Sequence, residues 1–220
     1  MLGQSGNENV RLEQASFWGE APKRRGGGRF DERARSNLFL AVVPEQAAAH
    51  QACEIGHRLG REHRLSHTPR PLELLHVTLN PIGSYMTLSE ADVFTVSDAM
   101  ASVRAAPFEA SFDRAASFSH GDRKLLVLGS AVRSEELMDL HVQLAKEMWG
   151  AGMTFTYNPR FMPHMTLSYG ETAMPETMLA EPVRWMVREV VLIHSLVGEG
   201  RYEYLGRWPL SDDLERRAVG

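Results

Sequence analysis

The stretch LLHVTLNPIG at residues 74–83 is the main guide to the fold of this chain, because a second stretch, MPHMTLSYG at residues 162–170, repeats its central pattern. In each stretch a histidine and a threonine stand two residues apart within an apolar run, and a leucine follows the threonine. Successive side chains of a strand point to opposite faces, so His76 shares a face with Thr78, and His164 shares one with Thr166.

One such polar pair on its own indicates only a half-exposed strand, since an unpartnered buried polar group costs a few kcal/mol. Two matching pairs change that interpretation. Both lie in strand-like runs in corresponding parts of the chain, and each run is flanked by segments with helical periodicity. The repetition favours two duplicated lobes that present matching polar faces to a shared groove.

The composition places the chain among soluble globular proteins. Of the 220 residues, 43% are hydrophobic and 24% are charged. No apolar run approaches the roughly 20 residues of a membrane span, and the first residues lack the apolar core of a signal peptide. The single cysteine, Cys53, excludes an internal disulfide, and we expect a cytoplasmic protein. A net charge of −4 argues against a broad surface for long nucleic-acid duplexes.

Three segments follow from composition. Residues 1–36 include KRRGGGRFDERAR, which has too few apolar residues to offset the entropy cost of ordering its glycines, and we expect a disordered arm. An arginine–glycine tail that touches nucleic acid is the alternative. Residues 37–210 form a single domain, and residues 211–220 form a tail.

Hydrophobic periodicity within residues 37–210 predicts an α+β fold. Helices are expected at 44–64, 89–105 and 134–150. Strands are expected at 38–43, 70–83, 108–118, 124–130 and 161–170, with two closing strands within 187–210.

Two histidines and two hydroxyl groups on facing strands suit an in-line displacement at phosphorus. One imidazole accepts a proton while the other donates one, and the threonine hydroxyls bind the phosphate oxygens. A metal site is the alternative, but it normally needs a third ligand, and Asn80 and Ser168 stand where an acidic residue would have to lie. We therefore expect neither a metal nor another cofactor, and the absence of a glycine-rich triphosphate loop gives no support to ATP-driven ligation.

With LHVTLNPIG, FMPHMTLSYG and the closing segment VVLIHSLVGEGRYEYLGRWPL, the chain resembles the two-histidine (2H) phosphoesterase superfamily. The resemblance is to its RNA 2',3'-cyclic phosphodiesterases, also called 2'-5' RNA ligases, and it extends from about Asn37 to Leu210. It implies a bilobal, pseudo-symmetric α+β fold of mostly antiparallel sheets with helices packed outside.

The resemblance also implies roles for the repeated residues. His164 would activate water and His76 would protonate the leaving 3' oxygen, while Thr78 and Thr166 would bind the phosphate. The substrates would be RNA 3' ends with a 2',3'-cyclic phosphate, and the product a 2'-phosphate. The reverse reaction would give ATP-independent 2'-5' ligation.

Two further interpretations remain open. One is a phosphodiesterase that acts on a small cyclic nucleotide or an ADP-ribose cyclic phosphate. The other is an RNA-binding module without turnover, although binding alone would not require both imidazoles. Whichever of these functions applies, we expect a monomer.

The chain departs from the family pattern after each motif. Pro81 stands where an aromatic residue is frequent, and Tyr169 stands where many members have an arginine. Tyr169 and Arg160 are therefore the remaining candidates for substrate binding, with Arg160 as a substitute source of the missing phosphate contact. A solvated arginine at the strand entry is the alternative for Arg160.

The remaining polar and aromatic candidates have simpler interpretations. The basic segment GHRLGREHRLSHTPR at residues 56–70, which contains His67 and Arg70, is expected to be a solvated helix end rather than a basic lip of the site. Phe39 and Phe118 are expected in the core rather than as stacking faces for a nucleobase, and His194 at the edge of the core.

Overall fold

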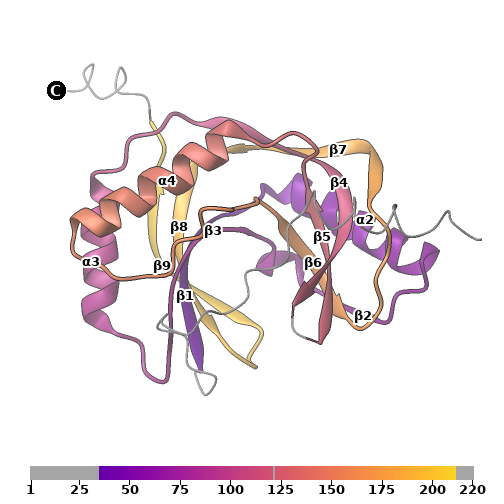
Figure 1. The fold of residues 1–220 in the computed structure, drawn as a ribbon, viewed down its shortest axis with the longest axis horizontal. Helices are drawn as coiled ribbons and strands as arrows, with labels where there is room; N and C mark the ends of the chain where they lie inside the picture. Colours follow the sequence, from indigo (N-terminus) through magenta and orange to yellow (C-terminus); the bar gives the residue numbers. More distant parts are fainter. Residues whose placement is uncertain (1–34, 121, 212–220) are drawn as a thin grey trace, which may run out of the picture.

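The computed structural model describes residues 35–120 and 122–211, and it has the expected α+β architecture (Figure 1). A nine-stranded sheet has the order β7-β4-β5-β6-β3-β1-β8-β9, and β2 pairs with β6. The strand pairings of this sheet are antiparallel. The predicted mostly antiparallel fold is therefore confirmed.

The described elements have the following bounds. The strands are β1 (Ser36–Val42), β2 (His67–Pro69), β3 (Val77–Tyr85), β4 (Phe108–His120), β5 (Arg123–Gly129), β6 (Met165–Gly170), β7 (Thr177–Val187), β8 (Glu189–Leu196) and β9 (Arg201–Pro209). The α-helices are α2 (Gln46–Glu62), α3 (Glu90–Ala101) and α4 (Glu135–Gly150), and the 3-10 turn η1 spans Leu72–Leu74.

The sheet consists of two lobes joined at one point. Strands β3 and β6, which lie at the centre of the order, pair only at Val77 and Met165. On one side lie β4, β5, β6 and β7 with β2, here called the first lobe; on the other lie β1, β3, β8 and β9, the second lobe. The bilobal arrangement expected from the resemblance is thus present.

Helices cover the two lobes separately (Figure 1). Helix α2 contacts β6 and β7 of the first lobe, whereas α3 contacts β9 and α4 contacts β3 of the second lobe. Ala48, Ala52 and Leu59, which lie on one face of α2, are buried in the core. Ser89 and Ser134 begin α3 and α4 by accepting hydrogen bonds from Asp92 N–H and Leu137 N–H.

Two strands were not expected from the sequence. Strand β7 alternates exposed and buried residues around Pro182, and it lies at the edge of the sheet, where a proline is tolerated. Strand β2 has only three residues.

The histidine strands also begin later than predicted. The segment 70–76 holds the 3-10 turn η1, and β3 starts at Val77, one residue after His76. In the same way β6 starts at Met165, one residue after His164.

The boundary of the N-terminal arm differs slightly from the prediction. Ser36 is buried in β1, and the N–H of Arg35 donates to the carbonyl of Tyr85 at 2.8 Å. Residues 1–34 of the expected arm, and 212–220 of the expected tail, lie outside the described residues. Across residues 35–120 and 122–211, no helix has the length and apolar character needed to cross a membrane.

Candidate active site

The two motifs meet at the joint between the lobes. Val77 pairs with Met165, and both side chains are fully buried in the core. In an antiparallel pair this register sets His76 level with Thr166 and Thr78 level with His164. The four predicted site residues therefore lie around a local two-fold axis, on the sheet face opposite the core. We call this face the histidine face.

A β-bulge follows each threonine at the same position. On β3, Thr78 pairs with Ala41 and Asn80 with Leu40, so Leu79 is the extra residue. On β6, Thr166 pairs with Val127 and Ser168 with Leu126, so Leu167 is the extra residue. The final leucine of each His-x-Thr-Leu motif thus forms the bulge. The duplication inferred from the sequence extends to this irregularity of the backbone.

The bulges change which residues reach the histidine face. Without them, Ser168 would share the face of Thr166, but Tyr169 pairs instead with Leu125, which lies two residues from Val127 on β5. By the same logic Pro81 pairs with Phe39 and shares the face of Thr78. The bulges therefore place Pro81 and Tyr169, the two departures from the expected pattern, on the histidine face.

Both histidines are held by the same backbone contact. His76 Nδ1 lies 2.9 Å from the carbonyl oxygen of Leu74, and His164 Nδ1 lies 2.9 Å from that of Met162. A carbonyl only accepts, so in both neutral rings Nδ1 carries the proton and Nε2 carries the lone pair. The Nε2 of His76 lies 3.1 Å from Thr78 Oγ1, whose hydroxyl donates to it. Each Nε2 is therefore the ring atom that can accept a proton.

Burial keeps both imidazoles uncharged. Burial, with smaller contributions from the charges of Arg70 and His164, lowers the pKa of His76 from 6.5 to about 3, while the bond to Leu74 opposes the shift. Burial also lowers the pKa of His164, against a bond to Met162 that raises it. The two rings flank the pairing of Val77 with Met165, and the charge of His164 is accordingly among the causes that lower the pKa of His76.

An aromatic ring packs against each histidine. Phe39 stacks on His76 with ring centroids 5.0 Å apart, and Phe118 meets His164 edge-on at 5.1 Å. Phe39 is buried, as the sequence suggested, and Phe118 is half-buried. Beyond filling space, these rings restrict how each imidazole can rotate.

Two residues that sequence reasoning did not assign to the site lie beside His76. Tyr202 of β9 meets the His76 ring edge-on at 5.5 Å, and its hydroxyl lies 3.4 Å from Nδ1. Arg70 donates from Nη1 to the Tyr169 hydroxyl at 2.7 Å and from Nη2 to the Tyr202 hydroxyl. The expectation that Arg70 belongs to a solvated helix end is wrong.

His67, from the same basic segment, is also structural rather than solvated. Its Nδ1 lies 2.9 Å from Ser168 Oγ, and its Nε2 lies 2.7 Å from the carbonyl of Thr172. These contacts attach β2 to β6 and to the segment that follows β6. The bulge explains why Ser168 faces His67 rather than the two catalytic candidates.

Arg160 and His194 lie in other surroundings. Arg160 is exposed, and its backbone N–H donates to Asn158 Oδ1 at 3.0 Å. His194 is buried and pairs with Glu203 at 3.0 Å. Its partner on β1 is Leu38, a residue of the main core, so His194 faces away from the histidine face, as expected for the edge of the core.

His141 of α4 connects the two motif segments from behind. Its Nδ1 lies 3.1 Å from the carbonyl of Leu79, and its Nε2 lies 3.2 Å from the carbonyl of Asn158. Tyr157 stacks on the ring with centroids 4.9 Å apart. The helix thereby fixes the loop that leads to His164 relative to the bulge after Thr78.

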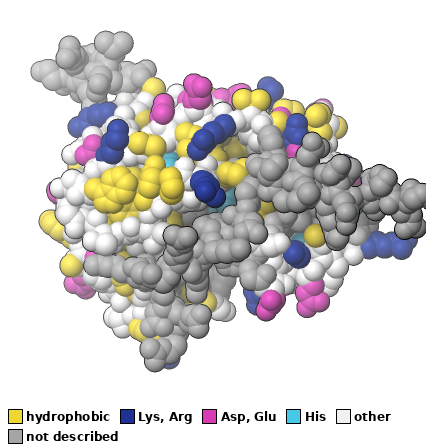
Figure 2. All heavy atoms as spheres, in the orientation of Figure 1, with side chains coloured by type: hydrophobic (Ala, Val, Ile, Leu, Met, Phe, Trp, Pro, Cys, Tyr) yellow, Lys and Arg dark blue, Asp and Glu magenta, His cyan; other side chains and the backbone are white. Residues whose placement is uncertain are grey.

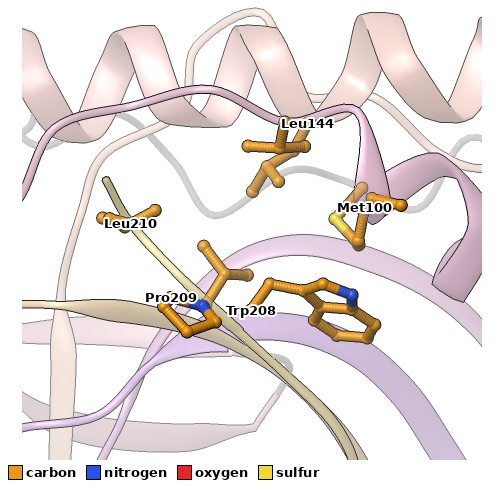
Figure 3. Close-up of a pocket in the computed structure, with 8 residues that line it drawn as sticks. Met100, Leu144, Trp208, Pro209 and Leu210 are labelled. Carbon is orange, nitrogen blue, oxygen red and sulfur yellow. The ribbon is translucent and has the colours of Figure 1, made fainter. Parts of the chain in front are cut away.

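A small apolar cavity of about 220 Å³ lies elsewhere, between α3, α4 and the end of β9 (Figure 3). Met100, Leu144 and Trp208 line it, together with Pro209 and Leu210. It contains none of the predicted site residues. Among the described residues, no group of three or more His, Cys, Asp or Glu side chains is placed to hold a metal ion.

Comparisons with known proteins bear on the family and the fold. A family model described as the 2'-5' RNA ligase superfamily matches residues 42–199. A search of curated proteins gives no match.

Several solved structures share the fold. The structure of E. coli LigT complexed with 3'-AMP has 23% sequence identity and a TM-score of 0.67, over 80% of this chain and 99% of that one. A structure described as a phosphoesterase has 22% identity and a TM-score of 0.65, over 81% and 99%. The protein TT0787 of Thermus thermophilus has 20% identity and a TM-score of 0.65, over 80% and 99%.

Proposed function

Since the chain belongs to the 2'-5' RNA ligase superfamily, we propose that it is a metal-independent phosphodiesterase that opens 2',3'-cyclic phosphates at RNA 3' ends to 2'-phosphates. The family resemblance drawn from the two His-x-Thr-Leu motifs is confirmed by the match to residues 42–199. The activity, the substrate and the roles of the residues are our proposal.

The observation that carries the proposal is the matched state of the two imidazoles. Each donates Nδ1–H to the carbonyl two residues before it, and each therefore offers Nε2 for proton transfer. A base for the incoming oxygen and an acid for the leaving oxygen are the two groups that an in-line displacement at phosphorus requires.

In the proposed reaction, Nε2 of His164 takes a proton from water while the water oxygen bonds to phosphorus. The bond from phosphorus to O3' breaks, and O3' takes a proton from Nε2–H of His76. The product carries a 2'-phosphate and a free 3'-hydroxyl, and the protons of the two imidazoles then re-equilibrate with solvent. If a ribose 5'-hydroxyl attacked in place of water, the new bond from O5' to phosphorus and the same loss of O3' would give a 2'-5' phosphodiester, which is ligation.

His76 must gain a proton before it can act as the acid. The free site disfavours the charged ring, with a pKa of about 3. A bound phosphate anion favours it, because an opposite charge nearby stabilises imidazolium. His76 therefore gains its proton when the substrate phosphate is bound.

The hydroxyl groups are proposed to hold the phosphate. Thr78 and Thr166 lie on the histidine face level with the opposite histidines, and each hydroxyl can donate to a non-bridging oxygen. Tyr169 reaches the same face through the bulge on β6. Arg160 remains a predicted phosphate contact that would need its exposed side chain to turn toward the substrate.

The surface charge supports short substrates over long duplexes. On the part of the face in Figure 2 that is not grey, Lys and Arg side chains are scattered among acidic and hydrophobic ones. The net charge of the chain is −4. Because phosphate backbones bind through clustered positive charge, an RNA end or a small nucleotide fits better than an extended RNA.

A small nucleotide is the second candidate substrate. Structures of E. coli LigT were obtained with 3'-AMP, ATP and NADP+. The alternative for this chain is therefore a cyclic mononucleotide or an ADP-ribose cyclic phosphate.

One experiment tests the proposal. Purified protein is incubated with an RNA oligomer ending in a 2',3'-cyclic phosphate, with 2',3'-cyclic AMP and with ADP-ribose 1'',2''-cyclic phosphate, each with and without EDTA. Phosphorus NMR identifies the product. We expect a 2'-phosphate from the RNA at a rate that EDTA leaves unchanged.

Three other outcomes would change the conclusion. A rate lost with EDTA and restored by one metal ion would make the histidines ligands. Turnover of only the two small compounds would show that the substrate is a small cyclic phosphate rather than an RNA end. Binding of RNA without turnover of any of the three would leave an RNA-binding module.

A further inference from the structure

Arg70 occupies a junction between the two lobes. It follows β2, and its half-buried guanidinium donates to three acceptors: Leu74 O from Nε at 2.9 Å, Tyr169 Oη from Nη1 at 2.7 Å, and Tyr202 Oη from Nη2. Tyr169 belongs to β6 of the first lobe and Tyr202 to β9 of the second. The guanidinium carbon lies 5.6 Å from the ring centroid of each tyrosine. Its position is therefore fixed from both lobes.

The same guanidinium is coupled to His76 through a shared acceptor. The carbonyl of Leu74 accepts both Arg70 Nε–H and His76 Nδ1–H, each at 2.9 Å. Tyr202 adds a second connection, because its hydroxyl accepts from Arg70 and lies 3.4 Å from His76 Nδ1. A displacement of Arg70 would therefore be transmitted to the ring of His76.

His164 differs from His76 in its charged surroundings. The charge of Arg70 is among the causes that lower the pKa of His76, whereas burial lowers the pKa of His164 and its bond to Met162 raises it. The two otherwise matched imidazoles thus differ in one charged neighbour. Their local backbone contacts do not distinguish them.

We propose that Arg70 is a positioning residue for His76, held by Tyr169 and Tyr202, and that it makes the two matched histidines unequal. It fixes the Leu74 carbonyl that sets the tautomer of His76, and it supplies a permanent positive charge beside that ring alone. Under the proposed function, on which this inference rests, such a charge makes protonated His76 the stronger acid of the pair, because it favours release of the proton to the leaving oxygen.

The first test needs no substrate. Histidine ring protons are followed by NMR against pH in the full-length protein, in Arg70→Gln, in Arg70→Lys and in a control, Arg61→Gln, which changes an exposed arginine of α2. The His76 signal is assigned by its loss in His76→Ala.

We expect the pKa of His76 to rise by on the order of one unit in Arg70→Gln, with little change for His164. Arg70→Lys retains the charge, so its His76 pKa stays near the wild-type value. An unchanged His76 pKa in folded Arg70→Gln, or equal shifts of both histidines, would overturn the proposal.

The second test uses the reaction. If wild-type protein turns over a cyclic phosphate, Arg70→Gln should lower kcat by about 10²-fold with a smaller change in KM, since a misplaced acid slows the chemical step. Tyr169→Phe removes one contact to the guanidinium and should show a weaker loss of the same kind. A KM effect alone would make Arg70 a binding residue instead.

The two tests separate the two proposals. If the wild-type protein turned over none of the cyclic phosphates, the proposed function would be wrong, but the titration would still test the effect of Arg70 on His76. Should Arg70→Gln fail to fold, Tyr169→Phe replaces it in the kinetic comparison, and a wild-type kcat in that variant would contradict the inference.

Discussion

His76 and His164 share the same backbone contact but have different surroundings. Each ring is oriented by a bond to the carbonyl two residues earlier, and each packs against a phenylalanine. The differences come from Arg70, which lies six residues before His76, and from Tyr202, which lies 126 residues after it. The sequence was therefore sufficient to find the pair, but not to assign different environments to its two members.

Removing either imidazole should abolish most turnover. We expect His76→Ala and His164→Ala each to lower kcat by roughly 10²–10⁴-fold, the usual contribution of one general acid or base. His50→Ala, which changes an exposed histidine of α2, is the matched control. Steady-state kinetics and circular dichroism check the result, and near-normal turnover in either site variant would exclude the paired mechanism.

The threonine hydroxyls should contribute less than the imidazoles. Thr78→Val and Thr166→Val preserve side-chain shape but remove one donor to the phosphate, so each should lower kcat/KM by the equivalent of one polar contact, about 1–3 kcal/mol. Thr78 also donates to His76 Nε2, so Thr78→Val should in addition alter the pH profile. An unchanged kcat/KM in the double variant would locate the phosphate elsewhere.

The lowered pKa values predict an acidic profile for the free protein. The base must be neutral and the acid protonated, and both pKa values lie below 6.5, that of His76 at about 3. We therefore expect both limbs of kcat/KM below pH 6.5 and a decline above it. A bound phosphate raises both pKa values, so the limbs of kcat should lie at higher pH. An optimum of kcat/KM above about pH 7 would contradict this assignment.

The regular helices and most strands could be predicted from the sequence, whereas the bulges within the strands could not. The three helices and most strands follow from apolar spacing, and α2 at Gln46–Glu62 lies within the predicted 44–64. The bulges at Leu79 and Leu167 leave no mark in the pattern, because both leucines are buried as a regular strand would also require. Their effect on Pro81 and Tyr169 depends on which residues the neighbouring strands pair.

Arg70 was missed for a related reason. In the sequence it ends a run of histidines and arginines that face water over most of its length. Its hydrogen-bond partners, Tyr169 and Tyr202, lie 99 and 132 residues further along the chain. Pairing of β2 with β6 places Arg70 near Tyr169, whereas Tyr202 reaches it from β9 of the other lobe.

The pairing of β2 with β6 depends on a glycine. A Cβ on Gly170 would lie 2.0 Å from His67 Cδ2 and 2.1 Å from the carbonyl oxygen of Ser66. We expect Gly170→Ala to lower both the free energy of unfolding and the turnover, because β2 must shift and Arg70 follows it in the chain. Thermal unfolding and kinetics measure the two effects.

Gly60→Ala is the control for Gly170→Ala, because Gly60 has room for a Cβ. It lies in α2, and a Cβ there would meet nothing within 4 Å. Gly60→Ala should stabilise the protein by about 0.5–1 kcal/mol, since alanine loses less entropy in a helix, and it should leave turnover unchanged. Equal effects of the two substitutions would show that the contact between Gly170 and His67 is unimportant.

For the protein as a whole, the start of β1 defines how much of the N-terminal segment the fold needs. Ser36 is buried, and the backbone of Arg35 is hydrogen-bonded to Tyr85 and Val197. Deleting residues 1–34 should therefore leave the melting temperature and the activity on short substrates unchanged. Deleting residues 1–36 should lower the melting temperature, because it removes these bonds from the end of β1. A large loss on the shorter deletion would show that residues before Arg35 contribute to the fold.

The joint at Val77 and Met165 has a mechanical consequence for the protein. Two extensive antiparallel lobes share a hinge that is one residue pair wide, and the general acid and base that we propose stand immediately beside it. A rotation about this hinge changes the gap between the imidazoles more directly than any distortion within a lobe. The guanidinium of Arg70 binds a tyrosine from each lobe and so acts as a brace across the hinge. The gap is thus bounded by this joint, by the Arg70 brace and, from behind, by His141, which links the bulge after Thr78 to the loop before His164.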